Sequence, residues 1–411
     1  MSDIMYTNYS DYTMAVICAT SSTMSAVRYM LDKEHGQGPP RQSGDTNTYI
    51  LGQMRGHNVV LVCLPSQQGK AAAAMVATNL ARTFRSIRLR LYVGVGGGVP
   101  SQQNDVRLGD VVVSMPTGPY GGVVQYDLGK KIEGDDPSGS FVLKGILRPP
   151  PDTLVGAVEV MRSDHLARDS KIDEFVDELM VRRQKLDQYK RPSNDLDVLF
   201  QADHSHVKSS RPGIAGLPCE GNCDRRKIVQ RPGRYDPSES VIHYGLIASG
   251  DSFIRSATYR DNIASRFGGD VLCFETGAAG LMTGYECLVI CGVSDYCDSH
   301  ESDIWHNYAA AAAAACAKEV IERLGPDAED RGAAAPNNWK SQNMSSWARN
   351  QNLPGSEPVF PQLMLQDSEE AGALNSHQIQ SNVLSGRRIQ NTGSGNFSVG
   401  SKANAGWQQG R

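Results

Sequence analysis

The stretch CFETGAAGLMTGYECLVICGVSDYCDSHESDIWHNYAAAAAAACAKEV, residues 273–320, decides the fold class of this chain. Its apolar segment CLVICGV predicts a buried strand, Asp295 follows that strand, and the alanine run 309–315 predicts a helix that packs closely. A carboxylate at the carboxyl end of a parallel strand lies where open α/β sheets bind ligands. Asp295 is therefore a candidate proton donor, and a turn or helix-capping residue is the structural alternative.

Similar apolar runs recur along the chain and predict further strands. They span residues 14–19, 58–65, 89–98, 110–116, 241–250, 270–275 and 287–295. Continuous Val, Ile and Leu runs of this kind suit strands that are buried on both faces. Helical patterns at residues 23–35, 69–84 and 308–324 alternate with these runs. The alternation predicts an α/β fold with a central sheet flanked by helices.

The chain changes character twice. Residues 162–192 are highly charged and predict one exposed helix, and residues 209–234 predict a long loop. We interpret the region of about 150–240 as an insertion in a single domain. From about residue 326 the chain is rich in Gly, Asn, Ser and Gln, a composition that predicts disorder. The expected organisation is an N-terminal extension (1–10), one domain (11–325) and a low-complexity tail (326–411).

Composition excludes several classes of partner. Hydrophobic residues make up 40% and charged residues 21%, and the net charge is −4, so neither a nucleic-acid nor a membrane partner is expected. The first residues lack a secretory-signal pattern, and no apolar run reaches the roughly 18–20 residues of a membrane span. Most of the nine cysteines lie in apolar runs, where a free thiol behaves as a small hydrophobe. We therefore expect a reducing compartment and a cytoplasmic location.

Two further stretches carry candidate ligand contacts. The segment YVGVGGGVP, residues 92–100, lets the backbone approach a ligand closely, although a plain structural turn explains it equally well. The segment IASGDSFI ends a predicted strand and then offers Phe253. An aromatic ring there could stack on a planar base, and a core phenylalanine is the simpler alternative.

Taken together, these stretches resemble the nucleoside phosphorylase / nucleosidase superfamily, in particular the methylthioadenosine/S-adenosylhomocysteine nucleosidase-like domains of fungal proteins. The resemblance covers roughly residues 11–325 and includes, in order, DYTMAVICA, NTYILGQMRGHNVVLVCLP, GKAAAA, VGVGGGVP, LGDVVVS, VIHYGLIASGDSFI, CFETGAAGLM and VICGVSDYCDSH. It implies a single-domain twisted mixed β-sheet surrounded by helices. It also implies a nucleoside-like ligand at the carboxyl edge of the sheet, no cofactor, no metal, and a homo-oligomer, most simply a dimer.

The resemblance also implies residue roles. Gly96, Gly97 and Gly98 match the glycines that face the ribose, and Phe253 matches the aromatic residue that stacks on the base. Asp295, with Ser294 beside it, matches the acid that protonates purine N7 as the base departs.

Two carboxylates of the family pattern are replaced. The family's xEMEAAG reads FETGAAG here, so Glu275 matches the first glutamate and Gly277 replaces the second, which binds the ribose hydroxyls. The family's CALPTE reads CATSST, so Thr23 replaces the glutamate that orients the attacking water. Loss of a positioned base commonly costs about 10²–10⁴-fold in rate, so we expect impaired or redirected activity. In a strand Glu275 would lie about 6–7 Å from position 277, too far to substitute without a shift.

Several alternatives stay open. Phosphorolysis would need an arginine for phosphate, and Arg28 and Arg107 are weak candidates. The domain is a nucleosidase on a purine nucleoside or a related compound, the same fold redirected to another small molecule, or a catalytically weak sensing module of the fungal NLR type. A tail of this composition is compatible with short self-assembling signalling motifs. His204, His206, Cys219 and Cys223 have the residue types for zinc but no familiar spacing, and we favour ordinary loop residues.

Overall fold

The computed structural model describes residues 8–36, 38, 40–65, 69–132, 140–182, 184–207, 223–236 and 238–325. The tail expected at 326–411 and most of the expected N-terminal extension lie outside the described residues.

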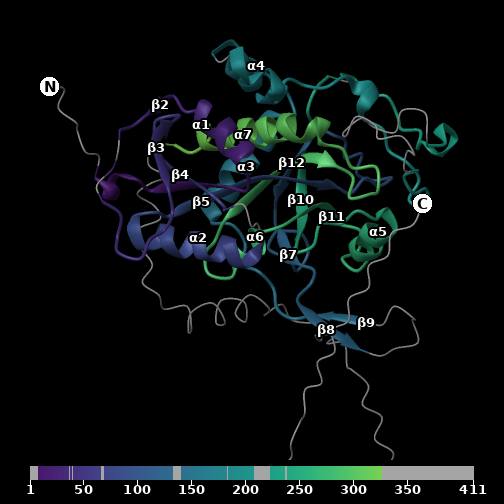
Figure 1. Cartoon of the computed structure of the whole chain (residues 1–411), viewed down its shortest axis with the longest axis horizontal. Helices are drawn as coiled ribbons and strands as arrows, with labels where there is room; N and C mark the ends of the chain where they lie inside the picture. The colour runs from purple at the N-terminus through teal and green to yellow at the C-terminus, as the bar shows by residue number, and fades with distance from the viewer. Residues whose placement is uncertain are drawn as a thin grey trace, which may run out of the picture. The chain divides into compact units, whose positions relative to one another are not determined.

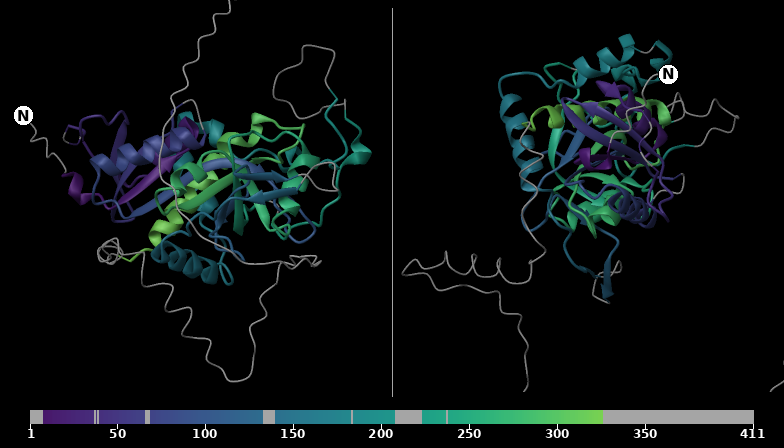
Figure 2. Two further views of the ribbon diagram at one scale, coloured as in Figure 1. Left: turned by 90° about the horizontal axis from the view of Figure 1, so that it is seen from below. Right: turned by 90° about the vertical axis from the view of Figure 1, so that its left-hand side faces the viewer.

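The described residues form a ten-stranded mixed sheet with the order β11-β10-β6-β12-β5-β1-β4-β3-β2, and β7 pairs with β10. Its strands are β1 (Met14–Cys18), β2 (Lys33–Glu34), β3 (Tyr49–Met54), β4 (His57–Cys63), β5 (Leu89–Gly98), β6 (Val111–Ser114), β7 (Val123–Gln125), β10 (Ile242–Ser249), β11 (Val271–Glu275) and β12 (Leu288–Asp295). All seven predicted apolar runs form strands. Two further strands, β8 (Gly129–Ile132) and β9 (Ser140–Leu143), pair only with each other and project from the core (Figure 2).

One end of the sheet closes on itself. β11 pairs in parallel with β10 on one side and antiparallel with β5 on the other, where Phe274 lies opposite Gly97. Because β10, β6, β12 and β5 follow one another in the sheet, this second pairing closes β11, β10, β6, β12 and β5 into a ring. The ends of β5, β11 and β12 therefore meet at one place.

Helices cover both faces of the sheet: α1 and α7 lie on one face and α2 and α6 on the other (Figure 1). The helices are α1 (Ser21–Tyr29), α2 (Lys70–Thr83), α3 (Asp152–Asp164), α4 (Ile172–Arg182), α5 (Ala257–Ser265), α6 (Ala278–Met282) and α7 (His306–Glu322). Short 3-10 turns span Tyr9–Asp11, Gln184–Tyr189, Asn194–Leu196, Arg225–Lys227 and Asp303–Trp305. The described part of the chain thus has the expected mixed sheet surrounded by helices.

The alanine-rich helix α7 is the central helix of its layer. Its residues from Tyr308 to Ile321 are all buried, because it packs on β12 on one side and on α1, α3 and α4 on others. A Cβ atom added at Gly292 of β12 would collide with the backbone carbonyl of Ala309. A glycine facing a run of alanines thus allows helix and strand to approach closely, as the sequence predicts.

The prediction of one exposed helix at residues 162–192 is wrong. The segment contains the end of α3 and all of α4, and both helices bury an apolar face against α7. Buried charges reinforce this contact: Glu319 of α7 accepts a hydrogen bond from His165 at 2.9 Å, and Lys318 lies 3.6 Å from Glu178. High charge density hid an amphipathic pattern whose apolar members include Phe175 and Leu179.

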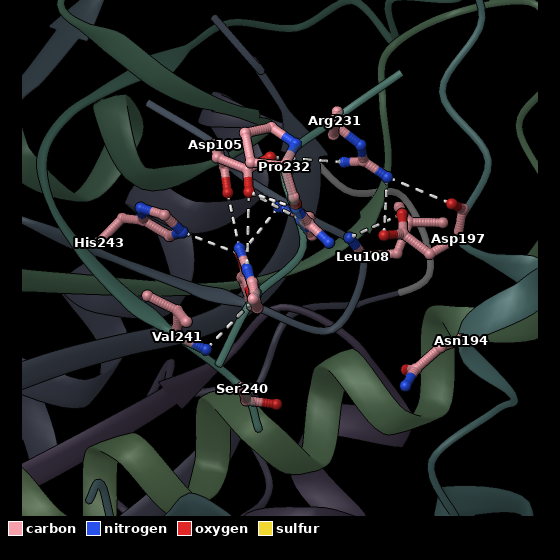
Figure 3. Close-up of polar contacts among 12 residues, drawn as sticks. Asp105, Leu108, Asn194, Asp197, Arg231, Pro232, Ser240, Val241 and His243 are labelled. Atoms are coloured by element: carbon pink, nitrogen blue, oxygen red, sulfur yellow. Dashed lines mark hydrogen bonds and ion pairs between the residues drawn. The ribbon is translucent and has the colours of Figure 1, made fainter. Parts of the chain in front are cut away.

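A network of charged side chains links the segment between α4 and β10 to the sheet (Figure 3). The side chain of Asp110, just before β6, is fully buried and accepts hydrogen bonds from Arg234 at 2.6 and 2.7 Å and from His243 at 2.8 Å. Burial alone would raise the pKa of Asp110, but these hydrogen bonds outweigh it and hold the pKa below its ordinary value. Nearby, Arg231 pairs with Asp197 at 2.8 Å.

The described cysteines are all free, and most of them are buried, as expected for thiols that act as small hydrophobes. Among the described residues, we find no helix with the length and apolar character that a membrane crossing requires.

Candidate active site

A cavity of about 230 Å³ lies where β5, β11 and β12 end. The loop after β1, the loop after β10 and the start of α7 complete its walls. Of the residues proposed from the sequence, Gly96, Gly97, Phe253, Glu275, Ser294 and Asp295 line this cavity. Gly98, Thr23 and Gly277 are not part of its lining.

Asp295 is the last residue of β12 and is held by two short hydrogen bonds. Its Oδ1 accepts the backbone N–H of Cys297 at 2.8 Å, and its Oδ2 accepts the hydroxyl of Ser294 at 2.8 Å. Burial raises the pKa of Asp295 to about 6, since desolvation outweighs these hydrogen bonds, and the nearby Glu301 and Asp298 raise it further. The carboxyl group is therefore oriented and exchanges a proton near neutral pH.

The glycines of β5 allow the strands to come together around Asp295. A Cβ atom at Gly97 would collide with Cys297 Sγ and would lie 2.6 Å from Asp295 Oδ1. A Cβ atom at Gly98 would lie 2.8 Å from a methyl group of Val293. The pairing of β12 with β5 slips by one residue between Val293 and Asp295, so Asp295 lies opposite Gly97. The absence of a side chain at Gly97 thus leaves space for the Asp295 carboxylate.

Glu275 ends β11 and is buried at the floor of the cavity, with 5% of its surface exposed. Its carboxylate accepts the backbone N–H of Ala278, at 3.2 Å for one oxygen and 3.1 Å for the other, and so caps the N-terminus of α6. Burial raises the pKa of Glu275 to about 7, although hydrogen bonds from Ser249, Ala278 and Tyr92 oppose the rise. Both carboxyl groups in the ring of strands therefore titrate near neutrality.

Gly277 occupies a backbone conformation that favours glycine. Its φ is +132°, and an added Cβ would lie 2.8 Å from Tyr92 Oη. Any side chain at this position strains the backbone between β11 and α6. A Gly277→Glu substitution, which would introduce the carboxylate that the sequence resemblance predicts here, would therefore disturb the turn as well as add a charge.

Thr23 lies inside α1 and its side chain is fully buried. Thr20 caps this helix: its Oγ1 accepts the backbone N–H of Thr23 at 3.2 Å and lies 2.9 Å from the Thr23 hydroxyl. Thr20 and Ala19 reach the cavity, whereas Thr23 stabilises the helix start.

Phe253 lies at the cavity mouth with 74% of its surface exposed. A large aromatic side chain that packs so little against the protein offers its ring to a ligand. The alternative of a core phenylalanine does not hold for this residue.

The structure adds polar residues that the sequence motifs did not single out: Thr20, Tyr92, Ser252, Glu301, Ser302, Asp303 and His306 line the cavity. Most of these follow β12 or begin α7, within the SDYCDSHESDIWH stretch, where the richness in acids was the available signal. Together with Glu275 and Asp295, they make the wall acidic. No Arg or Lys belongs to this lining among the described residues.

The two arginines considered for phosphate are engaged elsewhere. Arg28 pairs with Glu34 at 2.6 Å, and Arg107 pairs with Asp105 at 2.7 Å and donates to a carbonyl of Pro232. Neither lines the cavity.

His306, the first residue of α7, lines the cavity, and its burial favours the neutral form of the imidazole. Burial lowers its pKa, while Asp303 and Glu301 act in the opposite direction. Its Nε2 lies 3.2 Å from the hydroxyl of Ser22. A neutral imidazole can accept a proton from water or from a ligand hydroxyl. No Lys or Arg in the described lining of the cavity opposes the positive charge that it then carries.

Comparisons with known proteins give the following. No family model matches the chain. In sequence, the chain is 37% identical over 318 residues to a nucleotide-binding leucine-rich repeat (NLR)-like protein of Hyaloscypha variabilis, a match that covers 77% of this chain and 30% of that protein. The chain thus spans about 30% of the length of the curated relative it matches.

Solved structures similar to this one include the futalosine hydrolase of Helicobacter pylori, with 16% identity and a TM-score of 0.46 over 76% of this chain and 99% of that chain. A methylthioadenosine/S-adenosylhomocysteine nucleosidase from Neisseria meningitidis, in complex with methylthio-immucillin-A, has 18% identity and a TM-score of 0.46 with the same coverage. Its counterpart from Streptococcus pneumoniae has 20% identity and a TM-score of 0.45. The chain is thus similar in structure to a futalosine hydrolase and to methylthioadenosine/S-adenosylhomocysteine nucleosidases, and similar in sequence to an NLR-like protein.

Proposed function

We propose that this domain hydrolyses the N-glycosidic bond of a purine nucleoside or a related ribosyl compound, with Asp295 as the general acid. The observation that carries the proposal is the placement of Asp295: it ends β12, faces a cavity beside an exposed aromatic ring, and has a pKa of about 6. A general acid works best when its pKa lies near the working pH, because it is then partly protonated and still gives up its proton.

The residues that line the cavity include a donor and an acceptor for each proton that the reaction transfers. Asp295 donates a proton to a ring nitrogen of the base as the bond from C1′ to the base breaks. Water attacks C1′, and the neutral His306 accepts the proton that water releases. The products are the free base and the free sugar, and proton exchange with solvent restores both side chains. His306 would thus replace the water-orienting glutamate whose family position is Thr23.

The acidic wall suits a sugar that develops positive charge. The carboxylates of Asp303 and of Glu301, which also pairs with Arg255, line the cavity, can accept hydrogen bonds from hydroxyl groups, and stabilise an oxocarbenium-like transition state. Glu275, whose pKa burial raises to about 7, adds to this stabilisation when it is ionised. The same wall disfavours phosphate, since its described lining contains no cationic Lys or Arg. We therefore propose water, rather than phosphate, as the acceptor.

Base release from adenosine, methylthioadenosine and inosine tests this proposal. The full chain is incubated with each nucleoside, with and without phosphate, and the free base is quantified by chromatography. We expect release that phosphate does not accelerate. Asp295→Asn should lower the rate by about 10²–10⁴-fold, the usual contribution of a positioned acid. Asp270→Asn, an exposed site before β11, is the matched control and should keep the full rate.

A second candidate function rests on the relative in sequence. The NLR-like protein of Hyaloscypha variabilis contains a region similar to this chain within a much longer protein. We propose as the alternative that the cavity binds a nucleoside-like ligand without turning it over, so that the domain acts as a sensor. Nucleoside binding by calorimetry, with no base release over hours at micromolar protein, would favour this alternative. The homodimer implied by the resemblance stays a prediction, which light scattering tests.

A further inference from the structure

A second cavity, of about 300 Å³, lies next to the first and shares Ser294, Asp295, Glu301 and Ser302 with it. Cys223 and His300 belong to its lining. These residues come from two distant parts of the chain: Cys223 belongs to the chain between α4 and β10, and His300 belongs to the loop after β12. His204, from the first of these parts, lies beside them.

Three potential metal ligands converge at this place. One ligand atom each of His204, Cys223 and His300 lies within 4.8 Å of the other two. In tetrahedral zinc, bonds of about 2.0–2.3 Å put ligand atoms roughly 3.3–3.8 Å apart. Closing the observed set by about 1 Å is within reach of small side-chain rotations.

The histidine nitrogens point independently to a ligand. The His300 side chain is 5% exposed, and neither of its ring nitrogens has a hydrogen-bond partner among the described residues. The buried Nε2 of His204 also has none there. Leaving a buried polar atom without a partner is unfavourable, so ring nitrogens without a partner on two histidines of one cluster indicate a missing binding partner.

The surroundings orient these side chains as supporting residues do in metal sites. The thiol of Cys223 is 7% exposed; its Sγ accepts the backbone N–H of Val207 at 3.4 Å and lies 3.5 Å from Nδ1 of His206. The ring of Phe200 stacks on His300 with centroids 4.1 Å apart. The carboxylate of Asp298 lies 3.8 Å from Nδ1 of His300. A carboxylate behind a histidine ligand is a common arrangement around zinc.

We propose that His204, Cys223 and His300 bind a zinc ion. One thiolate and two imidazoles form a ligand set that zinc accepts readily, and three protein ligands leave a fourth position open toward the second cavity. The sequence favoured ordinary loop residues here, and it did not include His300, which is 77 residues beyond Cys223. Cys219, the other cysteine considered for zinc, lies outside the described residues.

The ion would join two segments that already meet through the hydrogen bond from the backbone N–H of His206 to the hydroxyl of Ser299, at 2.8 Å. It would fasten the chain around Cys223 to the loop that directly follows Asp295. The metal would therefore fix the wall shared by the two cavities, independently of whether the first cavity cleaves nucleosides.

Metal analysis of the full chain tests the proposal. Zinc is quantified by mass spectrometry in the purified protein, removed with a chelator, and replaced by Co²⁺. We expect one zinc per chain, and a Co²⁺ spectrum with tetrahedral d–d bands and a thiolate charge-transfer band. Cys223→Ser should abolish the charge-transfer band and weaken binding by more than the roughly 10–100-fold that loss of a supporting residue costs. Cys63→Ser, at a half-buried cysteine of β4, is the matched control and should leave both unchanged.

The outcomes separate cleanly. A wild-type chain that binds neither Zn²⁺ nor Co²⁺ at micromolar concentration overturns the proposal. So does a charge-transfer band that persists in Cys223→Ser. Should Cys223→Ser fail to fold, His204→Ala at a half-buried position carries the test, and its d–d bands must weaken. Nucleoside cleavage is measured in a separate assay. A failure to bind zinc therefore does not decide whether the domain cleaves nucleosides, and a failure to cleave nucleosides does not decide whether it binds zinc.

Discussion

Replacing Asp295 by asparagine should stabilise the fold at alkaline pH, even as it removes the proposed acid. The carboxyl group has a pKa of about 6 in the folded protein, against 3.8 for an unperturbed aspartate. Above pH 6 the folded chain must therefore hold an ionised group where burial disfavours it. Asparagine has nearly the same shape, carries no charge, and keeps an oxygen for the N–H of Cys297.

The size of the effect follows from linkage. The pKa gap corresponds to about 3 kcal/mol at 1.36 kcal/mol per pKa unit, reached once both the folded and the unfolded carboxyl groups are ionised. A raised folded-state pKa means that the folded state holds its proton more tightly, so wild-type stability falls, relative to the variant, as the pH rises from about 4 to 7. Asp295→Asn should be more stable than wild type by roughly 2–3 kcal/mol at pH 8 and by under about 1 kcal/mol at pH 4.

Urea unfolding of wild type and variant at pH 4, 6 and 8, followed by circular dichroism, measures this difference. Asp270→Asn is the control at an exposed aspartate and should change the unfolding free energy by under about 0.5 kcal/mol. A difference for Asp295→Asn that stays constant between pH 4 and 8, or a destabilisation at pH 8, would refute the assignment of a desolvated acid at this position.

Three further predictions test the surroundings of the site. Phe253→Ala should change the unfolding free energy by under about 0.5 kcal/mol, because the ring is 74% exposed. It should weaken nucleoside binding, measured by calorimetry, by roughly 2–10-fold, the equivalent of a stacking contact. An unchanged affinity would contradict stacking. Gly97→Ala should lower the unfolding free energy, measured in urea, by about 1–3 kcal/mol through overpacking. Gly156→Ala in α3, where an added Cβ meets nothing within 4 Å, should be neutral or stabilising. Equal tolerance of both substitutions would disprove the close packing at Gly97. Arg234→Ala should cost roughly 3–5 kcal/mol in urea unfolding at pH 7, since it removes a partner of the buried Asp110. A loss below about 1 kcal/mol would show that His243 and the backbone N–H groups of Arg107 and Val241 satisfy that carboxylate without Arg234.

The sequence predicts most of the sheet because its strands are continuous apolar runs. It predicts β4 but not β3, although a tight turn joins the two: Arg55 and Gly56 both have positive φ, at 50° and 84°. An arginine carries no strong signal for that conformation, so only the glycine marked the turn. The antiparallel pairing of β11 with β5 was not predictable either, because the register between distant strands depends on packing that no local pattern encodes.

The candidate site likewise contains residues that the sequence identified and residues that it did not. Asp295 and Glu275 end strands, where position along the chain fixes position at the sheet edge, and Phe253 lies in the loop just after β10. The sequence identified all three. His306 and Asp303 reach the cavity through the loop after β12, whose path follows from tertiary packing, and no motif marked them. Thr23 was assigned by its place in a motif, whereas its burial in α1 follows from helix periodicity.

The pH profile of base release tests the central claim most directly, since kcat/KM reports the protonation of essential groups in the free enzyme. For the wild-type chain with its best nucleoside, we predict a kcat/KM that falls about tenfold per pH unit above a pKa near 6, and a profile for Asp295→Asn in which this decline is absent. A wild-type chain that releases no base at any pH, or an Asp295→Asn variant that keeps both the rate and the decline, would contradict proton donation by Asp295.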